Sequence, residues 1–180
     1  LRRPDRVPDD AGPDPRVPLF AETTAALWFV AMVTSLGWLR AGGDWTTLGF
    51  ALLPGWGTVA AWVVAALGVA VLWFQWRTVL RSPEARDRYA TQADEAKGFD
   101  WIRPTTHREY RLFRVMAVSA GITEEVVFRG FLIGVLASWM PLWAAGLAAL
   151  FVFVGGHVYQ GLSGMLRILP VSAVLTFLFL

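Results

Sequence analysis

The chain has 180 residues, of which 56% are apolar and 17% charged, and its mean hydropathy is +0.49. Soluble domains are usually about 45–50% apolar, so this composition indicates a polytopic membrane protein. The net charge of +2 gives no sign of nucleic-acid binding, and the lack of cysteine excludes disulfides, thiolate metal sites and cysteine nucleophiles.

The N-terminal part of the chain divides into a polar tail and two apolar runs. Residues 1–18 contain five prolines among mixed charges, which predicts a disordered cytoplasmic tail. Residues 19–76 contain apolar runs at 21–39 and 56–76. At about 1.5 Å per residue, each run is long enough to cross a membrane as a helix. Residues 19–76 are therefore predicted to form two transmembrane helices.

The next part of the chain is polar and rich in positive charge. Residues 77–114 carry nine Lys/Arg against six Asp/Glu. Residues 77–106 are predicted to form a loop with a surface helix, which has Ser82 as its N-cap, Pro83 at its first position and Gly98 as its end. Because Lys and Arg collect in cytoplasmic loops, the N-terminus and the 77–114 loop are predicted to face the cytoplasm.

A long helix is predicted to follow this loop. The sequence Thr106 to Glu109 fits a capping box, so the helix should begin near His107. It can continue without interruption to about Trp139, because membrane helices accept glycine. His107 itself lies among charged residues and is predicted to be at the surface. The pair Met140–Pro141 then predicts a tight turn.

The remaining sequence predicts two more spans. An apolar run at 142–157 should return across the membrane, residues 161–167 should form a connection, and 168–180 should begin a fifth span. The predicted fold class is therefore all-α, a polytopic transmembrane helical bundle with five spans at least partly present. Because the last apolar run is shorter than the ~20 residues of a full span, we expect the C-terminal helices to be missing from this sequence.

Three charged residues interrupt the apolar part of the long helix. Glu124, Glu125 and Arg129 lie near its middle, and charge is costly to place inside a membrane, which indicates a functional site. Glu125 and Arg129 are four residues apart and are predicted to pair. Glu124 is rotated by about 100° and has no such partner, which suits a general base. His157, on the following helix, is predicted to reach a similar depth.

Structural interpretations of the same residues stay open at this point. A Glu–Arg pair inside a membrane also serves to pack helices together. A histidine beside two glycines, as His157 is, fits a packed residue hydrogen-bonded to a neighbouring helix.

The combination of motifs is more specific. "EEVVFR" follows the pattern E-E-x-x-x-R, and "FVGGH", from Phe153 to His157, follows F-x-x-x-H. In this order and spacing they resemble the first two motifs of the CPBP intramembrane proteases, a family that includes CAAX prenyl endopeptidases and bacteriocin-processing or immunity (Abi) proteins. The resemblance covers about residues 108–180. It implies that residues 107–180 form the N-terminal part of the protease core, truncated at its C-terminal end.

The resemblance also implies roles for individual residues. Glu124 and His157 would hold and activate a water, with Glu124 as the base, while Glu125, Arg129 and Phe153 would support them. The third motif of the family, a histidine with an asparagine-like residue four positions later, is expected in the full-length protein beyond this sequence. Members of the family are often labelled metalloproteases, but zinc takes three or four ligands. We therefore favour no cofactor over zinc, with Glu124 and His157 as the ligands if a metal binds.

These observations predict a hydrolase. Its function would be an intramembrane endopeptidase that cleaves a membrane-associated peptide or protein, with prenylated CAAX peptides as one substrate class. The alternative is a non-catalytic membrane scaffold, an immunity protein or a transport-related protein, in which the Glu–Arg pair is structural. The expected partners are the substrate and the lipid bilayer, with no nucleic acid, and the expected location is a prokaryotic plasma membrane.

Overall fold

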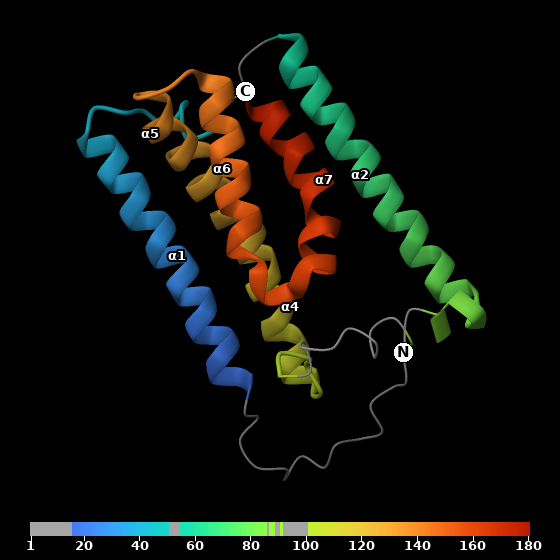
Figure 1. Cartoon of the computed structure of the whole chain (residues 1–180). Helices are drawn as coiled ribbons and strands as arrows, with labels where there is room; N and C mark the ends of the chain where they lie inside the picture. The colour runs from blue at the N-terminus through green and yellow to red at the C-terminus, as the bar shows by residue number, and fades with distance from the viewer. Residues whose placement is uncertain (1–15, 51–54, 86, 89–90, 92–100) are drawn as a thin grey trace. The chain divides into compact units, whose positions relative to one another are not determined.

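The computed structural model of the chain describes residues 16–50, 55–85, 87–88, 91 and 101–180 (Figure 1). All regular structure among these residues is helical, which confirms the predicted all-α class. Among the residues that the structure describes, three helices are long and apolar enough to cross a membrane, at Arg16–Arg40, Gly57–Val79 and Val158–Phe179. The described residues fall into two compact units, of which one contains helix α2 and the other contains the remaining helices.

Helix α1 (Arg16–Arg40) begins earlier than predicted. Residues 1–15 of the predicted tail lie outside the described residues, whereas Arg16, Val17 and Pro18 are already helical. A proline is accepted there because the N–H groups of the first helical turn have no partner within the helix. No charged residue follows Glu22 until Arg40, so most of α1 is apolar.

Helix α2 (Trp56–Arg81) forms the main part of its own unit. Most of its large apolar side chains are exposed, which fits a lipid environment rather than water. Ser82 ends this helix, since its N–H donates to the Thr78 carbonyl at 2.9 Å. The Ser82 hydroxyl also accepts from the Ala85 N–H at 3.1 Å and so caps the predicted surface helix. The predicted end of that helix at Gly98 lies outside the described residues.

The predicted long helix is present, but its interior has a different geometry. Helix α4 (His107–Glu124) is followed directly by the π-helix η1 (Glu125–Leu132) and by α5 (Ile133–Ala137). A π-helix closes i→i+5 hydrogen bonds, is rare and frequently occurs at functional sites. The expectation of regular α-helical geometry through both glutamates was therefore wrong. Glu124 ends α4, and Glu125 opens the π-helix.

Polar contacts join the first turns of α4 and α1. Thr106 caps α4 as predicted, because its hydroxyl accepts from the Glu109 N–H at 3.1 Å. The buried Glu109 carboxylate accepts from the Thr105 N–H at 2.7 Å and from the Thr105 hydroxyl at 2.9 Å. It also accepts from the Arg16 N–H at 3.3 Å and lies 3.7 Å from the Arg16 guanidinium. Glu109 therefore anchors the start of α1 to α4.

Helix α1 runs parallel to α4 and η1 and packs along both (Figure 1). Phe20 and Phe113 meet edge to face, with ring centroids 5.6 Å apart. Further along, Trp28 Nε1 donates to the Ser119 hydroxyl at 3.1 Å. Residue numbers increase together on the two helices, and this fixes their common direction.

Helices α6 (Leu142–Gly156) and α7 (Gly161–Phe179) complete this unit. α6 starts after Pro141, as the predicted turn requires, and packs against α5, η1 and α7. Two apolar clusters hold these helices together. The buried members of the first are Ile133, Ala145 and Ala149, and those of the second are Leu150, Phe153 and Val154.

The predicted connection at 161–167 was wrong, because this segment is the start of α7. The chain instead reverses over His157 and the short 3-10 helix η2 (Val158–Gln160). Gly161 has a φ of +70°, which glycine adopts without steric cost and which allows the sharp change of direction. Glycines in the segment suggested a loop, although membrane helices also accept them.

Candidate active site

Arg129 and Glu125 form an ion pair on η1. Arg129 Nη1 lies 3.1 Å from Glu125 Oε1, and the two side chains are 3% and 44% exposed. Arg129 Nη2 donates to the Ser172 carbonyl on α7 at 3.5 Å. Nη1 has no well-aligned hydrogen bond, so the contact with Glu125 is chiefly electrostatic. The pair thus occupies one of the two glutamates and ties η1 to α7.

Phe153 on α6 contacts residues of both sequence motifs. Its ring centroid lies 4.3 Å from the Arg129 guanidinium carbon, within the range of a cation–π interaction. The same ring meets Phe128 edge to face at 5.2 Å and lies 4.6 Å from the His157 ring. Phe153 is buried, so it connects the arginine of the first motif to the histidine of the second.

His157 caps the end of α6 and has a defined ring orientation. Its Nδ1 lies 2.8 Å from the Phe153 carbonyl oxygen. A carbonyl only accepts hydrogen bonds, so Nδ1 carries a proton and Nε2 of the neutral ring remains an acceptor. The Tyr159 ring stacks on the other side of the imidazole, with centroids 5.9 Å apart. His157 can therefore accept a hydrogen bond at Nε2.

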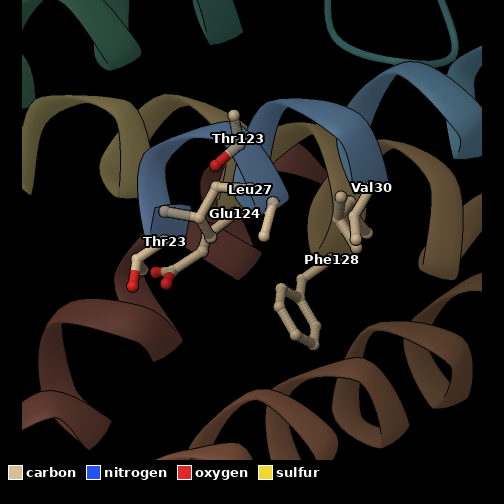
Figure 2. A pocket seen from close by; sticks show the side chains of 8 residues that line it. Thr23, Leu27, Val30, Thr123, Glu124 and Phe128 are labelled. Atoms are coloured by element: carbon tan, nitrogen blue, oxygen red, sulfur yellow. The ribbon is translucent and has the colours of Figure 1, made fainter. Parts of the chain in front are cut away.

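Glu124 is half-buried and lines a cavity of about 270 Å³ between α1 and the α4–η1 junction (Figure 2). Helix α1 contributes Thr23, Ala26, Leu27 and Val30 to the lining, and the other wall consists of Thr123, Glu124, Val127 and Phe128. Figure 2 shows the Glu124 carboxylate and the Thr23 hydroxyl at the same end of the cavity. Of the two adjacent glutamates, Glu124 thus belongs to the lining of this cavity and Glu125 does not.

Glu124 and His157 lie on neighbouring elements of the same unit. Glu124 ends α4 and His157 ends α6, and these two antiparallel elements meet through η1. The two motifs therefore lie on elements that pack against each other, and within the first motif Glu125 is held by Arg129.

The contribution of α1 to the site was hardly visible in the sequence. No residue of α1 was predicted to lie at the site, because Ala26, Leu27 and Val30 are ordinary members of an apolar run. Thr23 was a weak signal, as a hydroxyl near the start of that run. Gly130 is a second residue that was missed. A Cβ there would lie 2.8 Å from the Leu48 carbonyl oxygen, so glycine lets the 41–50 segment pack directly on η1.

The described residues do not match the ligand set of a zinc site. Among them, no three His, Cys, Asp or Glu side chains come together. A catalytic zinc usually takes three protein ligands. Glu124 and His157 provide two, and Glu125 is engaged by Arg129. No catalytic step is therefore assigned to a metal.

The structure has apolar helices long enough to cross a membrane and carries the two motifs on adjacent helices. Residues 108–180 match the family model described as type II CAAX prenyl endopeptidase Rce1-like. This match supports the CPBP/CAAX protease family for residues 108–180, the family that the two motifs indicated. Comparisons with curated proteins and with solved structures find no match. The match supports a CAAX-type intramembrane protease, and thus a hydrolase.

Proposed function

We propose that the protein is an intramembrane endopeptidase in which Glu124 activates water to attack a peptide carbonyl. The observation that carries this proposal is the different surroundings of the two adjacent glutamates. Arg129 pairs with Glu125, whereas Glu124 lines the cavity and forms no ion pair among the described residues. A carboxylate without a close ion pair is available to accept a proton, as a general base must.

In the proposed reaction Glu124 carries both proton transfers. Glu124 takes one proton from water as the water oxygen bonds to the carbonyl carbon. The tetrahedral intermediate then collapses, the C–N bond breaks, and Glu124 passes its proton to the departing amine. His157 Nε2 accepts a hydrogen bond from the second O–H of the water, which stays on the tetrahedral intermediate, because Nδ1 is bonded to the Phe153 carbonyl. Arg129 and Glu125 keep η1 in place beside these groups.

The substrate is proposed to be a membrane-associated peptide. The description of the matching family names CAAX prenyl peptides, so a prenylated CAAX peptide is the first substrate to assay. The exposed apolar surfaces of α1 and α7 fit contact with the lipid in which such a peptide is anchored.

A substitution that preserves shape tests the proposed base. Glu124→Gln removes the basic carboxylate, so the cleavage rate should fall by about 10²-fold or more. Glu22→Gln makes the same chemical change at an exposed position on α1 and should cleave at the wild-type rate. If Glu124→Gln also cleaves at the wild-type rate in membranes, Glu124 is not the base, and a non-catalytic scaffold becomes the better assignment.

We further propose that the end of α4 bearing Glu109 faces the cytoplasm, because the 77–114 segment is rich in Lys and Arg. The chain has no cysteine, so single cysteines report on topology. In intact cells an impermeant maleimide should label Ala41→Cys, at the far end of α1, and should leave Thr91→Cys unlabelled. The reverse labelling pattern would establish the opposite orientation.

A further inference from the structure

We infer that the cavity beside Glu124 is a specificity subsite that binds one apolar side chain of the substrate, next to the scissile bond, and that α1 sets the size it accepts. This inference rests on the proposed function, since it takes Glu124 as the group that activates water. It adds to that function a determinant of specificity outside the two motifs.

The chemistry of the cavity favours an apolar occupant. Five of its eight lining residues are apolar, namely Ala26, Leu27, Val30, Val127 and Phe128. Among the polar ones, the Thr123 hydroxyl already donates to the Ser119 carbonyl of its own helix at 2.8 Å. The remaining polar groups, Thr23 and Glu124, share one end of the cavity in Figure 2. A side chain that enters from that end therefore meets apolar walls beyond it.

The volume of the cavity limits the size of that occupant. Its ~270 Å³ is less than twice the ~150 Å³ of an engineered cavity that binds benzene. Scaled by volume from the six carbon atoms of benzene, the cavity holds a group of about ten carbon atoms, such as one large aliphatic or aromatic side chain. A farnesyl chain, with about fifteen carbons, exceeds this size on the same scale. The cavity therefore fits a side chain of the peptide better than its prenyl group.

The position of Glu124 identifies which side chain this is. A general base lies within about 3 Å of the water that it deprotonates, and that water contacts the attacked carbonyl. Glu124 is itself part of the cavity wall. The group that enters the cavity is therefore attached close to the attacked carbonyl, on a residue that flanks the scissile bond.

Helix α1 supplies half of the lining, and it lies outside the matched segment 108–180. Its position along α4 is fixed by the Glu109 contacts with Arg16 and by the Trp28–Ser119 hydrogen bond. Small changes in α1 side chains thus alter the volume beside Glu124 without touching either motif. Ala26 is the clearest case, because its single methyl group leaves room that a larger residue would fill.

Two neighbouring alanines provide a matched test. Ala26→Phe fills the cavity, whereas Ala25→Phe places the same ring at an exposed position that does not line it. Both variants are assayed in membranes against two pairs of prenylated peptides. The peptides of the first pair carry Ala or Leu at the residue before the scissile bond, and those of the second pair carry Ala or Leu at the residue after it. For one of these pairs, Ala26→Phe should lower kcat/KM for the Leu peptide relative to the Ala peptide by about tenfold or more, as pocket contacts of this size allow. Ala25→Phe should leave the ratio unchanged.

A second variant, which enlarges the cavity, tests the proposal if Ala26→Phe does not fold. Val30→Ala should raise kcat/KM for a peptide with Phe at the position that responds to Ala26→Phe, relative to the peptide with Leu there. Unchanged ratios in both variants, or an equal loss for every peptide, would overturn the subsite. If Glu124→Gln is inactive while these ratios stay constant, only the subsite inference fails. If Glu124→Gln is active, the proposed function itself fails.

Discussion

Two arginine–glutamate pairs lie in the same unit, and they bury opposite partners. At the start of α4, the Glu109 side chain is fully buried and that of Arg16 is 24% exposed. On η1, the Arg129 side chain is 3% exposed and that of Glu125 is 44% exposed. The first pair lies where α1 and α4 begin, and the second lies beside the proposed water site. Buried charge serves a different purpose in the two places.

The hydrogen bonding of the buried partner explains this difference. Glu109 accepts hydrogen bonds from Thr105 and from the Arg16 backbone, which compensate its burial. Arg129 has one ion pair, one long hydrogen bond to Ser172 and a contact with the Phe153 ring. A buried charge with incomplete partners is costly and needs a reason to persist. The less compensated pair is the one beside Glu124, where we propose the chemistry.

The largest change in stability is expected on η1. Glu125→Ala leaves the buried Arg129 without its counter-charge and should cost about 3–5 kcal/mol. Arg129→Met should cost less, because the carboxylate that it leaves behind is 44% exposed. The double variant should recover part of the loss of Glu125→Ala. Melting curves in detergent measure all three, and fully additive losses would contradict an energetic coupling between the two residues.

An intermediate change is expected at the start of α4. Glu109→Ala removes the acceptor of the Thr105 and Arg16 N–H groups, and because both hydrogen bonds are only part-buried, the total cost should be about 2–3 kcal/mol. Glu109→Gln keeps the shape and one acceptor oxygen, so it should lose less. Equal melting temperatures for Glu109→Ala and the wild type would show that this pair does not anchor α1.

The same residue predicts a dependence on pH. Burial opposes ionisation of Glu109, but hydrogen bonds from Thr105 and Arg16 outweigh it and lower the pKa below the ordinary value of 4.5. A lowered folded-state pKa gives stability that is complete above 4.5 and is lost as pH falls through the folded-state value. The stability advantage of the wild type over Glu109→Gln should therefore shrink on acidification from neutral pH. A constant difference would argue against a charged Glu109.

The smallest of these changes is expected beside Arg129. In Gly130→Ala the new methyl group would meet the Leu48 backbone, so the 41–50 segment must shift, at a cost of about 1–3 kcal/mol in total. Gly121→Ala is the matched control, because nothing lies within 4 Å of a Cβ at that position. Melting curves should separate the two variants, and equal values would show that the close approach at Gly130 is not required.

Features set by local spacing were predictable from the sequence. The Thr106 cap, the turn before Leu142 and the apolar runs each depend on residues close together in the chain. The proximity of Glu125 and Arg129 also followed from their separation, although the helix between them is of the π type. These predictions agree with the structure because short-range geometry leaves few alternatives.

Features set by packing were not predictable in the same way. A π-helix has no composition of its own, so nothing distinguished η1 from the flanking α-helix. The start of α7 at Gly161 was misplaced because glycine suits both loops and membrane helices. Ala26 and Val30 reach Glu124 only through the parallel packing of α1 on α4, and one apolar run carries no information on its neighbour.

The π-helix also gives the long helix a place where its length can change. A π-turn holds about one residue more than the α-turn that it replaces. Removing one residue from η1 therefore restores α-helical geometry and leaves α4 and α5 facing nearly the same partners. The same deletion within α4 rotates every later residue by about 100° and turns the Arg129 face away from α7. Homologous sequences that differ by one residue in this helix are thus expected to carry the gap within η1, so that an alignment needs no shift on either side.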